Sequence, residues 1–237
     1  MSLAGETLFA HDYRALVIGA GGAIGQAFVQ ALQADPRCVC VLALARAAGT
    51  GFDLRDECAI AQAAAAAAPQ GPWHCIVDAT GALTLDGHGP EKSLAALQPD
   101  VLASQFAINA IGPLLVLRHF APLLATGACI YAKLSARVGS ISDNRKGGWY
   151  GYRGSKAALN MYLQTAAIEL QRKNPELRVV ALQPGTVRSE LSRPFTHGTT
   201  PTLSPAESVA GMLEALRNLA PQAGAHFVDY RGQAIPW

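Results

Sequence analysis

Tyr152 and Lys156 are the two residues whose types and spacing most directly indicate chemistry. They stand four positions apart in a stretch with helical character, so we expect both side chains on one face of a helix. A lysine ammonium close to a phenol favours the phenolate, and we therefore expect it to lower the pKa of Tyr152 from its usual value near ~10. A tyrosine of this kind can give or take a proton near neutral pH.

Two further polar residues could act with this pair. Ser135 directly follows the apolar run Cys129–Leu134, where a hydroxyl could hydrogen-bond a substrate carbonyl. Asn109 interrupts a long helical stretch over residues 99–124, although Asn is a poor helix former. Either its side chain bends the helix or holds a water, or Asn109 is a tolerated interior polar residue.

A glycine-rich segment follows the first apolar run: Gly19-Ala20-Gly21-Gly22-Ala23-Ile24-Gly25. Glycines let a backbone approach a pyrophosphate, and a helix N-terminus offers free N–H groups and a partial positive charge. The GxGxxG spacing fails at Ile24, and a glycine-rich turn without a ligand is the alternative. The position of the segment between a strand and a helix favours dinucleotide binding.

The order of the elements predicts how these residues are positioned. We expect strands at 14–19, 39–43, 75–79, 129–134, 178–182 and 226–230, with a very short one before Asp53. Helical stretches cover 23–33, 57–68, 99–124, 152–171 and 205–219. The strands are continuous apolar runs, which is typical of a parallel sheet covered on both faces. The sequence therefore predicts one doubly wound, Rossmann-type α/β domain over residues 1–237.

Several polar residues follow strands, at the edge where ligands bind in such sheets. Arg46 follows the second strand, where NAD-binding domains carry an acidic residue, and a phosphate-binding arginine there favours NADP over NAD. The alternative is a solvated loop arginine. Asp53-Leu54 and Asp78-Ala79-Thr80-Gly81 also follow strands. Residues 1–11 are expected to be flexible, and residues 187–204 are expected to form a substrate lid.

Composition excludes several other classes. The net charge is +2 without a basic run, which argues against nucleic-acid binding. We find no signal peptide and no apolar run long enough to span a membrane, so we expect a cytoplasmic protein without a membrane partner. The five scattered cysteines and six histidines show no metal-ligand spacing, and no metal is expected. The low charged fraction of 15% suggests that part of the surface is buried in an oligomer.

Taken together, these residues resemble the short-chain dehydrogenase/reductase family over nearly the whole chain. Within that family the chain resembles the C-factor group, in residues Gly139 to Asn144, Gly147 to Tyr150, Tyr152 to Lys156 and the closing Ile235-Pro236-Trp237. Residues Gly19 to Gly25 are similar to the family's TGxxxGxG, and Asp53-Leu54 is similar to its adenine-contacting Asp-Val pair. Four residues match its catalytic tetrad: Asn109, Ser135, Tyr152 and Lys156. Pro184-Gly185, followed by Val187 and Ser189, resembles its nicotinamide-contacting PGxxxT.

The chain also departs from the family pattern. Ile18 replaces a threonine, Ala23 replaces a glycine, and Asp78-Ala79-Thr80-Gly81 stands where Asn-Asn-Ala-Gly is usual. Hydrogen bonds that hold the cofactor loops are therefore expected to differ from those of the family.

The resemblance implies an NADP-dependent enzyme that interconverts a carbonyl and an alcohol on a small organic substrate. In the implied mechanism Tyr152 protonates the carbonyl oxygen, Lys156 holds the nicotinamide ribose and lowers the pKa of Tyr152, Ser135 orients the carbonyl, and Asn109 anchors a water that relays protons. It also implies a homodimer or homotetramer. The alternative is a nucleotide-binding signalling protein with weak or no turnover.

The residues expected to contact the cofactor are, in chain order, Gly19, Gly21, Gly22, Ala23, Ile24, Gly25, Arg46, Asp53, Leu54, Ala79, Thr80, Gly81, Lys156, Pro184, Gly185, Val187 and Ser189.

Overall fold

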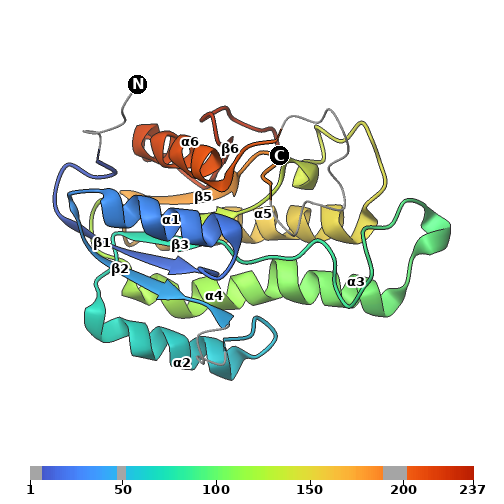
Figure 1. Ribbon diagram of the computed structural model, residues 1–237, viewed down its shortest axis with the longest axis horizontal. Helices are drawn as coiled ribbons and strands as arrows, with labels where there is room; N and C mark the ends of the chain where they lie inside the picture. Colours follow the sequence, from blue (N-terminus) through green and yellow to red (C-terminus); the bar gives the residue numbers. More distant parts are fainter. Residues whose placement is uncertain (1–6, 47–51, 189–201) are drawn as a thin grey trace.

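The computed structural model describes residues 7–46, 52–188 and 202–237 (Figure 1). Within these ranges six strands form one sheet in the order β2-β1-β3-β4-β5-β6, and all neighbouring strands pair in parallel. The strands are β1 (Tyr13–Ile18), β2 (Cys38–Leu44), β3 (Cys75–Asp78), β4 (Cys129–Leu134), β5 (Leu177–Gln183) and β6 (His226–Asp229). A very short strand was expected before Asp53; Phe52 is not in a strand, and residues 47–51 lie outside the described ranges.

Helices cover both faces of the sheet, which confirms the doubly wound fold. On one face lie α1 (Ala23–Ala34) and α6 (Pro205–Asn218) (Figure 1). Phe28 of α1 and Met212 of α6 belong to the same buried cluster as alternate residues of the strands. On the other face lie α2 (Glu57–Ala67), α4 (Gly112–Phe120) and α5 (Tyr150–Gln171). Because the strands are buried on both faces, their sequences are apolar throughout.

The strand order reverses direction between β1 and β3, and in open α/β sheets ligands bind at the carboxyl ends of the strands at such a point. The chain passes from β1 outward to β2 and then returns to β3 on the other side of β1. Ile18 and Asp78 are partners in the register of β1 and β3, so the segments that follow them start side by side. A Cβ on Gly19 would lie 3.0 Å from the backbone nitrogen of Thr80, which shows how closely the two segments approach.

The long helical stretch is divided into two helices around Asn109. The first is α3 (Pro99–Phe106), the second is α4, and between them Ala107–Ile111 forms a π-helical turn, η4. A π-helical turn changes the direction of a helix. This geometry favours the expectation that Asn109 accompanies a bend in the helix.

The helical stretch Pro99–Leu123 is, by length and composition alone, apolar enough to cross a membrane. This differs from the expectation that no such run exists in the sequence. In the fold, α4 packs between α2 and α5 over the sheet, as a core helix does.

The segment that precedes β1 packs against the domain. Leu8 and Phe9 are buried, the backbone nitrogen of Leu8 donates to Asp35 Oδ2 at 2.9 Å, and Arg217 donates to the carbonyl oxygen of Thr7. Ala10 and His11 of the same segment are exposed, and the flexibility expected for residues 1–11 stays a prediction. Residues 1–6 lie outside the described part of the chain.

Candidate active site

Tyr152 and Lys156 lie near the N-terminus of α5, as their spacing predicts. Lys156 is buried, and its Nζ lies 5.7 Å from the centroid of the half-buried Tyr152 ring. The same Nζ donates a hydrogen bond to the carbonyl oxygen of Leu134, the last residue of β4, at 3.1 Å. This bond ties the lysine to the carboxyl end of the central strand, next to Ser135.

The pKa values of this pair differ from the expectation. Burial raises the pKa of Tyr152 to about 12, so the predicted lowering by Lys156 is wrong for the chain alone. The pKa of Lys156 falls to about 7, first because burial disfavours its charge and second because Lys133 brings another positive charge nearby, while Asp78 acts in the opposite direction. A lysine that is partly neutral at pH ~7 favours the phenolate less than a fully charged one would.

Ser135 is buried beside α5 and has a partner that the sequence analysis did not single out. Its hydroxyl donates to Asn160 Oδ1 at 2.6 Å. Asn160 stands four residues after Lys156, so the spacing that pairs Tyr152 with Lys156 also points to it. Its Nδ2 is buried and has no hydrogen-bond partner among the described residues.

Asn109 is fully buried in the π-helical turn and holds the segment after β3. Its Oδ1 accepts from the backbone nitrogen of Ala82 at 2.9 Å, and its Nδ2 donates to the carbonyl oxygen of Ala82 and to Gln105 Oε1, both at 2.8 Å. A Cβ on Gly81 would lie 3.3 Å from Asn109 Oδ1 and 3.5 Å from Lys156 Nζ. The structure thus brings residues 81 and 82 against two of the expected catalytic side chains.

The glycine-rich segment leads from β1 into α1, as expected. Gly19 has a φ of +85°, in the left-handed region that favours glycine. Gly25 lies in the first turn of α1, where a Cβ would come within 2.9 Å of Ala20 Cα and closer still to Gly19. The N-cap is Gly22, without a side-chain hydrogen bond, and the first turn holds no acidic residue. The free N–H groups of Ala23 and its neighbours are therefore available to an anion.

Arg46 and Asp53 lie near one another, close to the carboxyl end of β2. Arg46 is exposed, and its charge contributes to a lowered pKa of Asp53, although hydrogen bonds from Arg55 are the larger cause. Arg55 Nη2 lies 3.0 Å from Asp53 Oδ2. Leu54 is buried, and its carbonyl oxygen would lie 2.6 Å from a Cβ on Gly112, so this segment packs directly on α4.

The turn after β3 is held by a charged side chain from β4 to which the sequence analysis assigned no role. Lys133, in β4, is fully buried and forms an ion pair with Asp78, its Nζ 2.9 Å from Oδ1. The same Nζ donates to the carbonyl oxygen of Thr80 at 2.6 Å and to its hydroxyl at 2.9 Å. A lysine in a continuous apolar strand is the sequence feature that could have revealed it.

The segment after β5 has its two described ends tied together. Gly185 has a φ of +77° and packs against Tyr230, and the carbonyl oxygen of Pro184 accepts from Ser208 of α6 at 2.6 Å. Leu203 pairs with Val187: its nitrogen donates to the carbonyl oxygen of Thr186, and its own carbonyl accepts from Arg188, both at 2.9 Å. Ser189 and most of the expected lid, residues 189–201, lie outside the described ranges.

Glu91 and Trp149 are two further residues near Tyr152 to which the sequence analysis assigned no role in the site. Glu91 is buried, its carboxylate accepts from the nitrogen of Gly151 at 3.0 Å, and its carbonyl accepts from Trp149. Trp149 has a left-handed backbone and presents its ring edge-on to Tyr152, at 6.2 Å between centroids. These contacts fix the start of α5.

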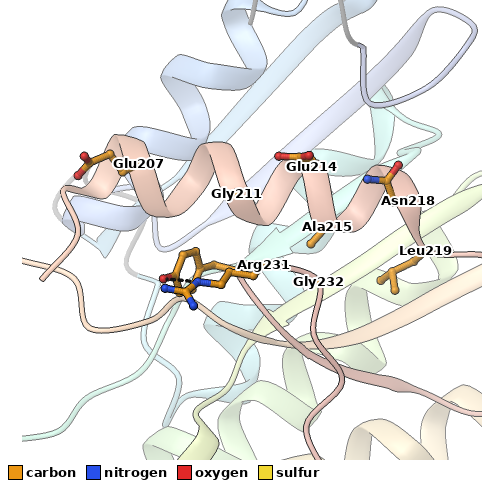
Figure 2. Close-up of a pocket in the computed structure, with 9 residues that line it drawn as sticks. Glu207, Gly211, Glu214, Ala215, Asn218, Leu219, Arg231 and Gly232 are labelled. Carbon is orange, nitrogen blue, oxygen red and sulfur yellow. Dashed lines mark hydrogen bonds between the residues drawn. The ribbon is translucent and has the colours of Figure 1, made fainter. Parts of the chain in front are cut away.

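A cavity of about 470 Å³ lies on another part of the domain, between α6 and the residues after β6 (Figure 2). It is lined by Glu207, Gly211, Glu214, Ala215, Asn218, Leu219, Tyr230, Arg231 and Gly232. The expected site residues are not among them. Arg231 turns back onto its neighbour, with Nε donating to the hydroxyl of Tyr230 at 2.8 Å.

Comparisons with known proteins agree with this arrangement. The model of the short chain dehydrogenase family matches residues 13–199. The chain is similar to C-signal of Myxococcus xanthus, 40% identical over 138 residues, which cover 57% of this chain and 78% of that protein. It is also similar to 1-hydroxy-2-glutathionyl-2-methyl-3-butene dehydrogenase of Rhodococcus sp. strain AD45, 30% identical over 188 residues and 79% of both proteins.

Solved structures agree in fold. The NADPH-bound carbonyl reductase from chicken fatty liver superposes with a TM-score of 0.84 at 23% identity, covering 99% of this chain and 97% of that one. The family match extends over more than half of the chain, from β1 to beyond β5. This chain therefore belongs to the short chain dehydrogenase family.

Proposed function

We propose that this protein is an NADP-dependent oxidoreductase that interconverts a carbonyl group and an alcohol on a small organic substrate. One observation carries the proposal: Tyr152 and Lys156 lie together on α5, and Lys156 faces Gly81 at the carboxyl edge of the sheet. The phosphate-binding segment after β1 opens at the same edge, beside Thr80. The proposed proton donor and the proposed dinucleotide site therefore adjoin each other.

The residues at this edge fit a dinucleotide. The N-terminus of α1 has neither a side-chain cap nor an acidic residue, so its N–H groups suit a pyrophosphate. Arg46 is exposed and suits the additional phosphate of NADP. In this proposal the remaining cofactor contacts come from Asp53, Leu54, Ala79, Thr80, Gly81, Lys156, Pro184, Gly185, Val187 and Ser189. When bound, the cofactor supplies the hydride, and the protein supplies position and charge.

Tyr152 suits a proton donor to a carbonyl oxygen. Its pKa of about 12 keeps the hydroxyl protonated at neutral pH, and the charged form of Lys156 would stabilise the phenolate that remains after transfer. Ser135 would orient the carbonyl. Rotating the Asn160 amide by half a turn would let its Nδ2 donate to Ser135, which leaves the serine proton for the substrate oxygen.

The test is NADPH oxidation across a panel of aldehydes, ketones and quinones, with Tyr152→Phe as the decisive variant. The variant keeps the ring and should bind NADPH as the wild type does, but turnover should fall by about a hundredfold or more. Tyr150→Phe is a matched control, because Tyr150 lies two residues away on the same helix and is exposed. Near wild-type turnover of Tyr152→Phe would refute the assigned role.

A second candidate function is a nucleotide-binding signalling protein with weak turnover. It is favoured by the similarity to C-signal over 138 residues. The two candidates differ in one observation: a signalling protein would bind NADPH yet show no substrate in the panel whose reduction depends on Tyr152.

We also propose a homodimer or homotetramer in the cytoplasm. Large apolar side chains are exposed on α5, where Met161 and Ile168 lie seven residues apart on one face. Ile111, in the π-helical turn, is exposed as well. All five cysteines are free, which agrees with a reducing compartment.

A further inference from the structure

A buried ion pair lies beneath the proposed cofactor site. Lys133 and Asp78 are partners in the register of β4 and β3, and both side chains are essentially without exposure to solvent. Successive side chains of β4 point to opposite faces of the sheet, so Lys133 lies on the same face as Tyr131. Lys133 stands two residues before Ser135. Burying an ammonium is costly unless its charge is paired and its donors are satisfied, so the contacts of this lysine need an explanation.

The ammonium of Lys133 binds both the last residue of β3, Asp78, and Thr80 in the turn that follows it. Nζ lies 2.9 Å from Asp78 Oδ1, 2.6 Å from the carbonyl oxygen of Thr80 and 2.9 Å from its hydroxyl. Asp78 Oδ1 also accepts from the nitrogen and the hydroxyl of Thr80. Lys133, Asp78 and Thr80 are therefore joined through Asp78 Oδ1 by charge-assisted hydrogen bonds, which are stronger than neutral ones, while Asp78 Oδ2 is buried and has no partner among the described residues.

This set fixes where the rest of the turn lies. Gly81 follows Thr80 directly and stands against Asn109 and Lys156, and Ala82 is held by Asn109. On its other side, the backbone of Thr80 lies against Gly19 of the phosphate-binding segment. A shift of Thr80 would therefore change the spacing between the catalytic side chains and the dinucleotide site.

We infer that Lys133 is a positioning residue of the cofactor site, whose ammonium, paired with Asp78, holds the turn from Asp78 to Gly81 at its distance from Asn109 and Lys156. The inference rests on the proposed function. It also explains two departures from the family pattern together, because Asp78 and Thr80 supply the oxygen atoms that Lys133 requires. The charge of Lys133 reaches the catalytic lysine as well, since it contributes to the lowered pKa of Lys156.

A role confined to stabilising the sheet is the competing explanation, and two measurements separate it from positioning. The first is hydrogen exchange of the amides of residues 79–82 in the protein without cofactor. The second is the dissociation constant of NADPH, followed by its fluorescence. A purely structural role lowers the melting temperature but leaves both of these readouts unchanged in the protein that remains folded.

Lys133→Met is the first variant, because it keeps the length of the side chain and removes the donors. We expect at least about a tenfold loss of amide protection confined to residues 79–82, and about a tenfold weaker binding of NADPH. Asp78→Asn combined with Lys133→Met removes the charge together with its partner. This double variant should show the same two losses if the single variant, with its unpaired buried carboxylate, fails to fold.

Tyr131→Phe is the matched control. Tyr131 lies on the same strand and the same face, and its buried hydroxyl has no hydrogen-bond partner in the described part of the chain. It should keep both protection and affinity within about twofold of the wild type. Unchanged protection of residues 79–82 in both Lys133 variants would overturn the inference. Failure of the wild type to bind NADPH would instead overturn the proposed function, and the exchange measurement would still decide the role of Lys133.

Discussion

Substituting alanine at Gly25 and at Gly22 should separate two roles of the glycine-rich segment. A Cβ on Gly25 would lie 2.8 Å from the carbonyl carbon of Gly19 and 2.9 Å from Ala20 Cα, and closer still to the Gly19 carbonyl oxygen. A Cβ on Gly22 would meet nothing closer than 3.6 Å. Gly25→Ala should therefore strain the fold itself, whereas Gly22→Ala should affect only a ligand that approaches the helix end.

The size of the effect at Gly25 follows from two opposing contributions. Alanine is favoured over glycine within a helix by about 1 kcal/mol. Overpacking costs about 1–3 kcal/mol, and the upper end applies because the atoms that would be met are backbone atoms, which cannot rotate away. The net destabilisation is about 2 kcal/mol, which corresponds to a melting temperature lower by about 4–8 °C for a domain of this size.

The assay is thermal unfolding of both variants without cofactor, followed by NADPH titration. Gly25→Ala should melt several degrees below the wild type. Gly22→Ala should have the melting temperature of the wild type but bind NADPH more weakly, because its methyl group stands at the uncapped end of α1. Equal melting temperatures for the two variants would refute the steric argument. Wild-type affinity in Gly22→Ala would show that the cofactor does not approach this residue.

Three further predictions concern charge and association. For carbonyl reduction at subsaturating NADPH, kcat/KM should fall as pH rises through about 7, because Lys156 loses its charge there, and Lys156→Met should lack this decrease in the pH–rate profile. Arg46→Ala should weaken NADP binding by about tenfold to a hundredfold while leaving NAD binding nearly unchanged. Dissociation constants of both cofactors check this, with Arg55→Ala as the control, and equal losses for both cofactors would contradict it. Sedimentation should show a multiple of the 24.8 kDa chain mass, reduced by Met161→Lys but not by Leu94→Lys; a wild-type monomer would exclude the oligomer.

The sequence was sufficient for those parts of the site that depend on local spacing. The alternation of apolar runs and helical stretches predicted the parallel sheet, because strands buried on both faces must be apolar throughout. The spacing of Tyr152 and Lys156 predicted their common helix face, because a helix repeats every 3.6 residues. The position of the glycines after β1 predicted their place at the N-terminus of α1.

Contacts between distant parts of the chain could not be predicted in this way. Lys133 and Asp78 are 55 residues apart in sequence, and only the register of β3 and β4 brings them together. Glu91 reaches the start of α5 across 60 residues. The raised pKa of Tyr152 could not be predicted for the same reason. It results from burial, which depends on the whole fold, whereas the sequence argument considered only the charge of the neighbouring Lys156.

The pairing of Val187 with Leu203 has a consequence for how this scaffold can change. Because Thr186, Arg188 and Leu203 are tied by backbone hydrogen bonds, two parts of the chain that are about fifteen residues apart in sequence are held side by side here. The entropic cost of closing a loop grows only slowly with its length, by about 0.6 kcal/mol for each doubling. Changes in the length of the sequence between these anchors should therefore be tolerated, with little effect on the stability of β5 and α6.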